Sequence, residues 1–396
     1  MSKLEELLNK LCSDGVEFIK LDKCLSYEQP TKYIVKCKDY IETGLPVLTA
    51  GQTFILGYTD ETEGVFNASK DNPVIIFDDF TTSFHWVDFD FKIKSSAMKM
   101  LRPRADMNIS FRFVYYAMKC IKYQTLEHSR QWISKYSQLE IPLPPIEVQN
   151  EIVRILDCFT QLEAELEAEL DCRKRQYEFY RDQLLGFDKL TPPERNNVVW
   201  MPITEVFEMR NGYTPSKNKP EYWEGGKIPW FRMEDIRQNG RILSDSIQHI
   251  TMDGVKKGNL FKANSFILAT TATIGEHALV IADSLANQRF TNLSVRKSLK
   301  DRIIIKFLFH YMFIIDDWCK NNVNISGFAS VDMNKFKKLK IPIPPIEEQN
   351  RIVAILDRFE SLTTSLQHGL PAEIAARRQQ YEYYRDKLLD FKRKTA

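Results

Sequence analysis

The sequence lacks any long apolar run. No stretch of about 18 consecutive apolar residues occurs among its 396 residues, so no membrane-spanning helix is expected. The opening residues, MSKLEELLNKL, carry charges where a secretory signal would be apolar. The composition, 43% apolar and 27% charged, is typical of a soluble globular protein. We therefore expect a cytoplasmic protein with room for about two or three domains.

The common signatures of metal binding and catalysis are also missing. The seven cysteines include no Cys-x-x-Cys pair, which argues against a zinc site and favours free thiols. No GxxxxGK(S/T) phosphate loop, no GxGxxG and no Pro-Pro-aromatic motif of amino-methyltransferases is present. Asp90 and Lys92 have the spacing of a metal-dependent nuclease, but alternating charges on a solvated strand explain them more simply. We expect that the chain itself catalyses nothing.

What the sequence does contain is one stretch written twice. IPLPPIEVQNEIVRILDCF, residues 141–159, returns as IPIPPIEEQNRIVAILDRF, residues 341–359, with 14 of 19 positions identical. QYEFYRDQLLGF, residues 176–187, returns as QYEYYRDKLLDF, residues 380–391, with 9 of 12 identical. The offset grows from 200 to 204 residues, about one helical turn. The chain is therefore predicted to consist of two homologous halves.

Each copy of the repeat is predicted to begin one long helix. The Pro-Pro pair near its start is tolerated in a first helical turn but not in a helix interior. Apolar residues then recur at heptad spacing, which is typical of a helix that packs along another helix. We expect an antiparallel coiled coil with a pseudo-two-fold axis. The predicted seam consists of Ile152, Ile155, Phe159, Leu162, Leu166, Leu170, Tyr177, Tyr180 and Leu184 in the first helix and of Ile352, Ile355, Phe359, Leu362, Leu366, Leu370, Tyr381, Tyr384 and Leu388 in the second.

The predicted fold class is α+β, with two mixed α/β globular domains separated by the two long helices. The expected segments are a first domain with a short N-terminal helix, a first helix, a second domain, and a second helix with a tail, at residues 1–140, 141–187, 188–340 and 341–396. Strand and helix patterns follow one order in both domains. Stretches 45–54, 73–87 and 111–121 correspond to 228–237, 264–280 and 303–314. The domains share a plan but little identity.

Charge is divided unevenly along the chain. Residues 188–340 carry 23 basic and 16 acidic side chains, whereas residues 141–187 carry 5 and 10. A polyanion would be attracted to the former and repelled by the latter. Ordinary surface variation can produce such a surplus, so charge alone does not decide for nucleic acid.

Polar and basic residues in predicted loops and strand ends are better candidates for DNA contacts. Lys, Arg and hydroxyl groups hold phosphates, while Arg reads guanine and Asn or Gln reads adenine in the major groove. Any single candidate could instead cap a loop or form a surface ion pair. The candidates are Thr49, Gln52, Thr81, Thr82, Ser83, Ser95, Ser96, Lys99, Arg102 and Arg104 in the first domain and Arg210, Asn211, Tyr213, Thr214, Arg232, Arg237, Thr270, Thr271, Thr273, Asn287, Gln288 and Arg289 in the second.

The duplicated helix motif, together with RNGYTPSK, IPWFRMEDIR and TTATIGEHAL in the second half and VLTAGQTFILGY in the first, resembles the specificity subunits of type I restriction-modification systems. The resemblance extends from about Val16 to Phe391. It implies two target-recognition domains that each read one half of a split sequence in double-stranded DNA, held apart by an antiparallel coiled coil.

The same resemblance implies partners and assigns the cofactors to them. The helices would dock two methyltransferase subunits, which use S-adenosylmethionine, and through them the ATP-driven restriction subunits. S-adenosylmethionine, ATP and magnesium would bind those partners and not this chain. The rival interpretation is a structural coiled-coil scaffold whose globular ends bind proteins. A methyltransferase-nuclease fusion is disfavoured by the missing motifs.

A tetrapeptide repeat lies within the first predicted helix. LEAELEAEL, residues 162–170, repeats a unit of four, which approximately preserves helical phase and adds about 6 Å per unit. We therefore predict that this segment sets the length of the unread DNA spacer. A solvated acidic helix surface is the simpler alternative.

Overall fold

The computed structural model describes residues 3–51, 53–125, 129–187, 197–324, 329–364 and 369–394. The chain forms two compact units: unit 1 comprises Met1–Glu165 with Ala375–Ala396, and unit 2 comprises Leu166–Ile374. Each unit thus combines a globular part with pieces of the long helices. Within the described ranges, no helix is both long and apolar enough to cross a membrane.

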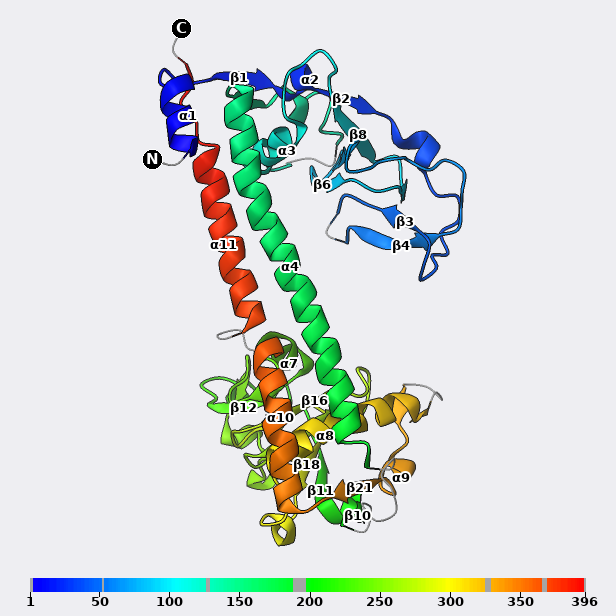
Figure 1. Cartoon of the computed structure of the whole chain (residues 1–396). Helices are drawn as coiled ribbons and strands as arrows, with labels where there is room; N and C mark the ends of the chain where they lie inside the picture. Colours follow the sequence, from blue (N-terminus) through cyan, green and yellow to red (C-terminus); the bar gives the residue numbers. More distant parts are fainter. Residues whose placement is uncertain are drawn as a thin grey trace. The chain divides into compact units, whose positions relative to one another are not determined.

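Unit 1 contains two small sheets and a separate antiparallel pair of strands, β1 and β9, next to the start of the long helix α4 (Figure 1). The strand order is β2-β8-β5-β6 in the antiparallel sheet and β4-β3-β7 in the mixed sheet, where β3 and β7 are parallel. Its elements are α1 (Lys3–Leu11), β1 (Glu17–Lys20), α2 (Leu21–Cys24), β2 (Leu25–Glu28), β3 (Leu45–Leu48), β4 (Ile55–Thr59), β5 (Val74–Asp78), β6 (Phe84–Val87), β7 (Lys92–Ile93), β8 (Met98–Pro103), α3 (Phe111–Lys119), β9 (Glu140–Leu143) and the first part of α4 (Ile146–Leu184).

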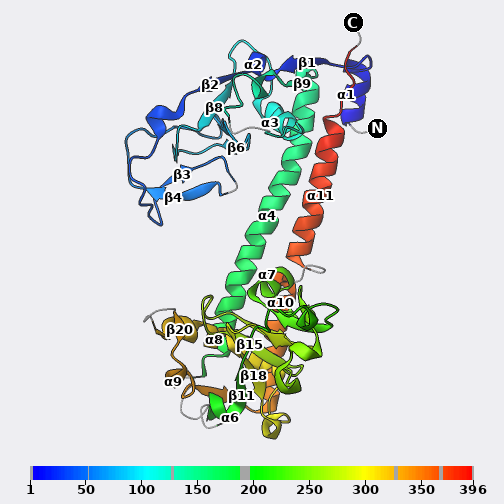
Figure 2. The ribbon, with the colours of Figure 1, turned by 180° about the vertical axis from the view of Figure 1, so that it is seen from behind.

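Unit 2 repeats this plan with more strands (Figure 2). The strand order is β11-β18-β15-β16-β13 in the larger sheet and β14-β12-β17 in the smaller one. Its elements are β10 (Val199–Pro202), α6 (Ile203–Val206), β11 (Phe207–Asn211), β12 (Ile228–Phe231), α7 (Met233–Asn239), β13 (Ile242–Leu243), β14 (His249–Ile250), β15 (Ser265–Ala269), β16 (His277–Val280), β17 (Leu285–Ala286), β18 (Phe290–Val295), α8 (Ile305–Asn321), β19 (Val323–Asn324), β20 (Ser330–Val331), α9 (Met333–Phe336), β21 (Lys340–Ile343), α10 (Ile346–Thr364) and the start of α11 (Leu370–Leu388).

The strand pairing next to the repeated motif has the same register in both units. Phe18 of β1 lies opposite Pro142 of β9, and Trp200 of β10 lies opposite Pro342 of β21. The predicted correspondence of the two globular parts is confirmed by this register and by the shared strand order. β3, β5 and α3 of unit 1 correspond to β12, β15 and α8 of unit 2.

A repeated glutamine explains part of the identity between the two motifs. The Gln149 Oε1 accepts a hydrogen bond from the backbone nitrogen of Ser110, the N-cap of α3, at 2.9 Å. The Gln349 Oε1 accepts one from the backbone nitrogen of Ile304, the N-cap of α8, at 2.8 Å. Both amides are buried, and each donates to the first proline carbonyl of its own Pro-Pro pair. The glutamine therefore joins the start of the long helix to a helix of the globular part.

The antiparallel packing of the two helical segments is confirmed within each unit. In unit 1, Phe159 stacks on Tyr384 with ring centroids 5.5 Å apart, and Glu163, further along α4, pairs with the earlier residue Arg378 of α11. In unit 2, Tyr180 stacks on Phe359 at 5.3 Å. Phe159 and Phe359 occupy the same place in the two motifs, and so do Tyr180 and Tyr384. The two stacks are therefore reciprocal, as the pseudo-two-fold prediction requires.

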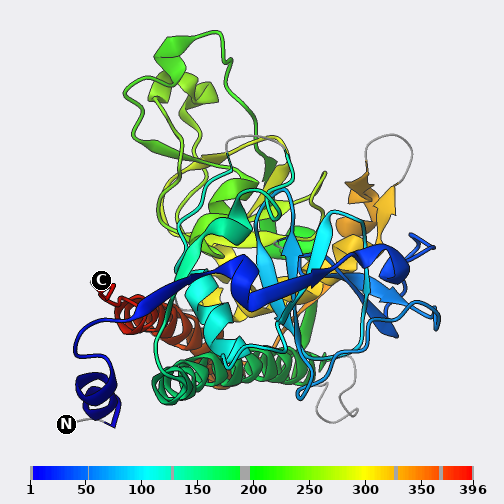
Figure 3. The ribbon, with the colours of Figure 1, turned by 90° about the horizontal axis from the view of Figure 1, so that it is seen from above.

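The C-terminal segment completes unit 1 beside the start of the chain (Figure 3). The Val16 backbone nitrogen donates to the Lys392 carbonyl, and the Lys394 nitrogen donates to the Val16 carbonyl, each at 2.9 Å. The Arg393 guanidinium lies 4.5 Å from the ring centroid of Phe18. The last residues thus cover the strand that begins the first globular part.

The prediction of one continuous second helix is wrong. α10 ends at Thr364 and α11 begins at Leu370. Gly369 has φ +144°, and a Cβ at this position would lie 2.7 Å from the Ser361 carbonyl oxygen. Pro371 is the second residue of α11, where a missing N–H costs no helical hydrogen bond. The Gly-x-Pro sequence therefore marks a helix start that the heptad pattern concealed.

The predicted seam is buried to different degrees along α4. Val148, Ile152 and Leu156 of α4 are fully buried and belong to the core of the unit 1 globular part. Ile155 and Phe159 lie on the same apolar stripe of the helix and are half-buried, and Ile155 packs against that core. A helix that packs on a globular core and on a second helix needs such a broad apolar stripe. Leu362 is exposed and is not part of a buried seam, and Leu366 lies outside the described residues.

Candidate nucleic-acid interface

Five of the predicted DNA-contacting residues meet in one cleft of unit 2. The cleft has a volume of about 610 Å³ and lies where β11 ends, beside the turn after β15 and the loop after β17. We call it the polar cleft. Its lining includes the predicted residues Arg210, Asn211, Thr270, Thr271 and Gln288, together with Met209, Thr291, Ser330, Val331, Met333 and Lys337.

The wall of the polar cleft is fixed by a short chain of hydrogen bonds. Asn211 and Thr291 are opposite each other on β11 and β18, and the Thr291 hydroxyl donates to the Asn211 Oδ1 at 3.1 Å. The Thr270 and Thr291 hydroxyl oxygens lie 3.1 Å apart, and both side chains are buried. Asn211 itself is exposed, and its Nδ2 donates to no residue in the described part of the chain. The amide is thus held by its oxygen and presents its donor side.

A second amide at the rim is held in the same way. The Thr214 hydroxyl donates to the Gln288 Oε1 at 2.5 Å, and Gln288 is exposed. Side-chain amides held by one end are suited to base edges, because their orientation is fixed before a ligand arrives. Two such amides on one cleft favour a hydrogen-bonding ligand.

Arg210 supplies the positive charge at this rim. Its guanidinium lies 4.7 Å from the ring centroid of Phe261, and burial lowers its pKa while the nearby Tyr213 raises it. A guanidinium this basic stays protonated at neutral pH. The group is therefore a permanent cation that stacks on an aromatic ring at the edge of the cleft.

The other candidates of unit 2 do not line the polar cleft. The Tyr213 hydroxyl donates to the Gly254 carbonyl at 3.2 Å, so this ring supports a loop. Arg232 is the N-cap of α7 and its guanidinium lies 5.8 Å from the Trp230 ring centroid. Arg237, Thr273, Asn287 and Arg289 are exposed or half-buried at α7, in the β15–β16 turn and after β17.

The candidates of unit 1 lie at three turns and one strand end. Thr81, Thr82 and Ser83 form the β5–β6 turn, in which Thr82 has φ +59°. Thr49 follows β3, and Ser95 and Ser96 connect β7 to β8. Arg104 is exposed and donates to the Asp22 carbonyl, while Arg102 is half-buried over the Phe66 ring. Gln52 lies outside the described residues.

The prediction that Lys99 contacts DNA is wrong. Its side chain has 0% exposure, and its ammonium lies 3.4 Å from the Asp79 Oδ2 and 3.0 Å from the Gln29 Oε1. Asp79 is also fully buried. An ammonium enclosed in this way cannot reach a phosphate. The misassignment arose because β8 is buried on both faces, so its lysine does not alternate outward as an edge strand would place it.

Six lining residues were missed, of which Thr291, Ser330 and Lys337 are polar. Ser330 and Lys337 enter the polar cleft from the segment that precedes β21. The basic run KFKKLK, residues 335–340, was the available sequence signal. It stands immediately before the second repeat, where it was assigned to a domain boundary.

One group in unit 2 has the composition of a metal site but a simpler explanation. His310, Asp357 and Glu360 offer ligand atoms within 4.8 Å of one another. The Lys306 ammonium already lies 3.5 Å from the Asp357 Oδ1 and 3.4 Å from the Glu360 Oε2. The corresponding carboxylate of unit 1, Asp157, pairs with a guanidinium in the same manner. The group is therefore an ion-pair network that joins the long helix to α8.

The chain has clear relatives among known proteins. The family model "Type I restriction modification DNA specificity domain" matches residues 21–171 and again residues 196–376. The chain is 45% identical, over 99% of its length and 97% of the relative, to the Escherichia coli "Type I restriction enzyme EcoR124I/EcoR124II specificity subunit". It is 53% identical over 49% of its length, and 50% of the relative, to the EcoprrI specificity subunit, also of Escherichia coli. The chain belongs to the family of type I restriction-modification specificity subunits.

Solved structures agree with the fold. The structure titled "Crystal structure of Type-I restriction-modification system S subunit from M. genitalium" is matched with a TM-score of 0.53 at 15% identity, covering 95% of this chain and 96% of that one. A chain from a study of complex assembly of the type I R-M system gives a TM-score of 0.55 at 17% identity, covering 95% of this chain and 97% of that one. At these identities the likeness concerns the fold.

Proposed function

We propose that this chain recognises a specific bipartite DNA sequence within a type I restriction-modification complex, with one unit for each half of the target. The observation that carries the proposal is the contrast between the two units. They share strand order and register, yet they place different side chains at corresponding surface positions, such as the exposed Ser26 of β2 and the exposed Glu208 of β11. A scaffold that bound one kind of protein at both ends would need like surfaces, so the scaffold interpretation is not favoured.

The polar cleft supplies the chemistry of recognition in unit 2. Its oriented amides, Asn211 and Gln288, offer donors to acceptor atoms on base edges. Arg210 and Lys337 offer charge to phosphates or to guanine. Base edges select the sequence and phosphates fix the position of the duplex.

We further propose that the chain performs no catalysis and docks the subunits that do. Methyltransferase subunits would carry S-adenosylmethionine, and restriction subunits would carry ATP and magnesium. The repeated motif supports this docking because it keeps matching residues exposed in both copies. Asn150 and Asn350 are identical in the two copies and exposed in both. Phe179 and Tyr383, also at matching positions, are 59% and 60% exposed.

A binding experiment with the assembled methyltransferase complex tests the proposal. Duplexes that contain the sequence that the complex methylates should bind more tightly than scrambled duplexes of equal length, at every salt concentration. Equal affinity for both would contradict sequence recognition. Replacing Asn150 and Asn350 together by Ala should abolish assembly with the methyltransferase subunits, which would support docking. Unchanged assembly of a variant that lacks both asparagines and both exposed aromatic rings would contradict it.

A further inference from the structure

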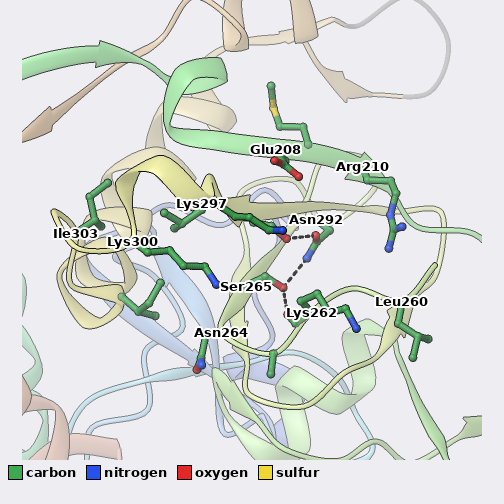
Figure 4. A pocket seen from close by; sticks show the side chains of 15 residues that line it. Glu208, Arg210, Leu260, Lys262, Asn264, Ser265, Asn292, Lys297, Lys300 and Ile303 are labelled. Carbon is green, nitrogen blue, oxygen red and sulfur yellow. Dashed lines mark hydrogen bonds between the residues drawn. The ribbon is translucent and has the colours of Figure 1, made fainter.

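A second cleft opens on the same edge strand of unit 2. It has a volume of about 520 Å³ and shares Met209 and Arg210 with the polar cleft (Figure 4). We call it the basic cleft. Glu208, Arg210, Lys262, Asn292, Lys297 and Lys300 are among its lining residues.

The basic cleft gathers more positive charge than its surroundings neutralise. Lys262 is paired with Asp283 at 2.7 Å. Lys297 and Lys300 are exposed, and neither forms an ion pair with a described residue. Figure 4 shows both side chains extending toward the hydrogen-bonded Ser265 and Asn292. Two unpaired ammonium groups at one cleft repel each other, and an anion between them would remove the repulsion.

The floor of the basic cleft is polar but already satisfied. The Asn292 Nδ2 donates to the Ser265 Oγ at 2.9 Å and to the Phe266 carbonyl at 3.0 Å. The Asn292 Oδ1 accepts from the Ser294 Oγ at 2.9 Å. Asn292 and Ser265 are buried, so their bonds hold the strands together. The floor therefore offers few free groups for reading bases, in contrast with the exposed amides of the polar cleft.

The two clefts meet at the free edge of the larger sheet, where Arg210 of β11 lines both. Successive side chains of a strand point to opposite faces of the sheet. Asn292 in the floor of the basic cleft and Thr291 in the wall of the polar cleft therefore lie on opposite faces of β18. A duplex that crosses this edge at Arg210 would place backbone in the basic cleft and base edges at the polar cleft.

We propose that the basic cleft binds backbone phosphates of the duplex beside the bases read in the polar cleft, with Lys297 and Lys300 as the principal contacts. This inference rests on the proposed function. It assigns to the cleft affinity without sequence preference, because phosphates are the same at every base pair.

The anchor is specific to unit 2. Its segment between β18 and α8, residues 296–304, carries four basic residues and one acidic residue. The corresponding segment of unit 1 between β8 and α3, residues 104–110, carries only Arg104 against Asp106. The two units would therefore grip the DNA backbone unequally.

A salt titration tests the proposal on the methyltransferase complex. The double variant K297Q/K300Q should bind target and scrambled DNA more weakly by the same factor. The slope of log affinity against log salt should become shallower by about 1.8, since each phosphate contact contributes about 0.9. The ratio of the DNA affinity at 50 mM salt to the DNA affinity at 200 mM salt should therefore decrease about tenfold. The methylated sequence should not change.

A matched control changes lysines outside both clefts. K227Q/K257Q replaces two exposed lysines of unit 2 that line neither cleft, and its slope should stay within about 0.5 of the unaltered complex. An unchanged slope for K297Q/K300Q, loss of affinity for the target alone, or loss of methyltransferase assembly would overturn the proposal. The last result would indicate an acidic protein surface as the ligand. If the unaltered complex shows no sequence preference, the proposed function fails. The difference in salt slope between K297Q/K300Q and the unaltered complex still shows whether these lysines contact phosphates.

Discussion

Units 1 and 2 place different chemistry at the same buried position. In unit 1, Lys99 on β8 lies between Asp79 and Gln29. In unit 2, the strand register puts Thr291 at the place of Lys99, with Thr270 and Asn211 around it. A charged trio in one half is thus a hydroxyl and amide trio in the other. The backbone plan does not require particular side chains here, which leaves the adjoining surface free to diverge.

The junctions between globular part and long helix show the opposite behaviour. Asp157 accepts from Arg112 on α3, and Asp357 pairs with Lys306 on α8. The ring at the next turn changes from Tyr116 to His310, yet Tyr116 bonds to Asp157 and His310 bonds to Asp357, the matching aspartate. The function of the contact is retained while its partners vary. Constraint is therefore concentrated where helices meet domains.

The largest expected effect concerns the continuous helix α4, which lacks the interruption found between α10 and α11. Inserting one LEAE unit after Glu165 should lengthen the unread spacer of the target by about two base pairs, because about 6 Å is added and base pairs are 3.4 Å apart. Methylation mapping in cells that carry the variant measures the spacer. An unchanged spacer would refute the prediction that this helix segment sets the spacer length.

The charged trio should be the most fragile difference between the units. Replacing Lys99 by Met leaves the Asp79 carboxylate buried without its cation and should cost about 3–5 kcal/mol. The matched change in unit 2, Thr291→Val, removes neutral hydrogen bonds and should cost about 1–3 kcal/mol. Urea denaturation of both variants checks the ranking. Equal losses would show that the two trios are energetically alike.

The repeated glutamines should behave identically. Replacing Gln149 or Gln349 by Leu leaves the N-cap nitrogen of α3 or α8 and a proline carbonyl without their partner. Each change should cost about 1–3 kcal/mol, the range for unsatisfied buried groups. Denaturation midpoints of the two single variants decide the matter. A cost in only one unit would break the equivalence of the two junctions.

A smaller effect should separate the units in acid. Arg154 and Lys3 lower the pKa of Glu151 to about 2, and α1 packs on this part of α4. A carboxylate with a depressed folded pKa contributes stability above its unfolded pKa near 4.5 and loses it as pH falls toward 2. Unit 2 has Arg351 at the same position.

Hydrogen exchange of α1 at pH 6 and at pH 3 measures the acid effect. Protection should decrease at pH 3 in the unaltered chain. Glu151→Gln should show reduced protection at both pH values and little change between them. Equal acid sensitivity of the variant and the unaltered chain would assign the effect to another group.

The duplicated architecture could be predicted from the sequence because the patterns that indicate it are local. Helix phase, the Pro-Pro starts and the order of strand patterns are set by neighbouring residues, and each was found. Lys99 could not be placed, because its burial depends on Asp79 and Gln29, which reach it from segments distant in the sequence. The polar cleft was found only in part, since Ser330 and Lys337 reach it from a distant segment. The break before α11 was readable from Gly369 and Pro371 but was outweighed by the heptad pattern.

The central claim is that each unit reads its own half of the target. It is tested most directly by single-molecule methylation sequencing of DNA from cells that carry the complex with Asn211→Ala and Gln288→Ala. The account predicts relaxed sequence at one half of the bipartite site, with the other half and the spacer unchanged. Relaxation of both halves, or of neither half in a complex that still methylates, would contradict it.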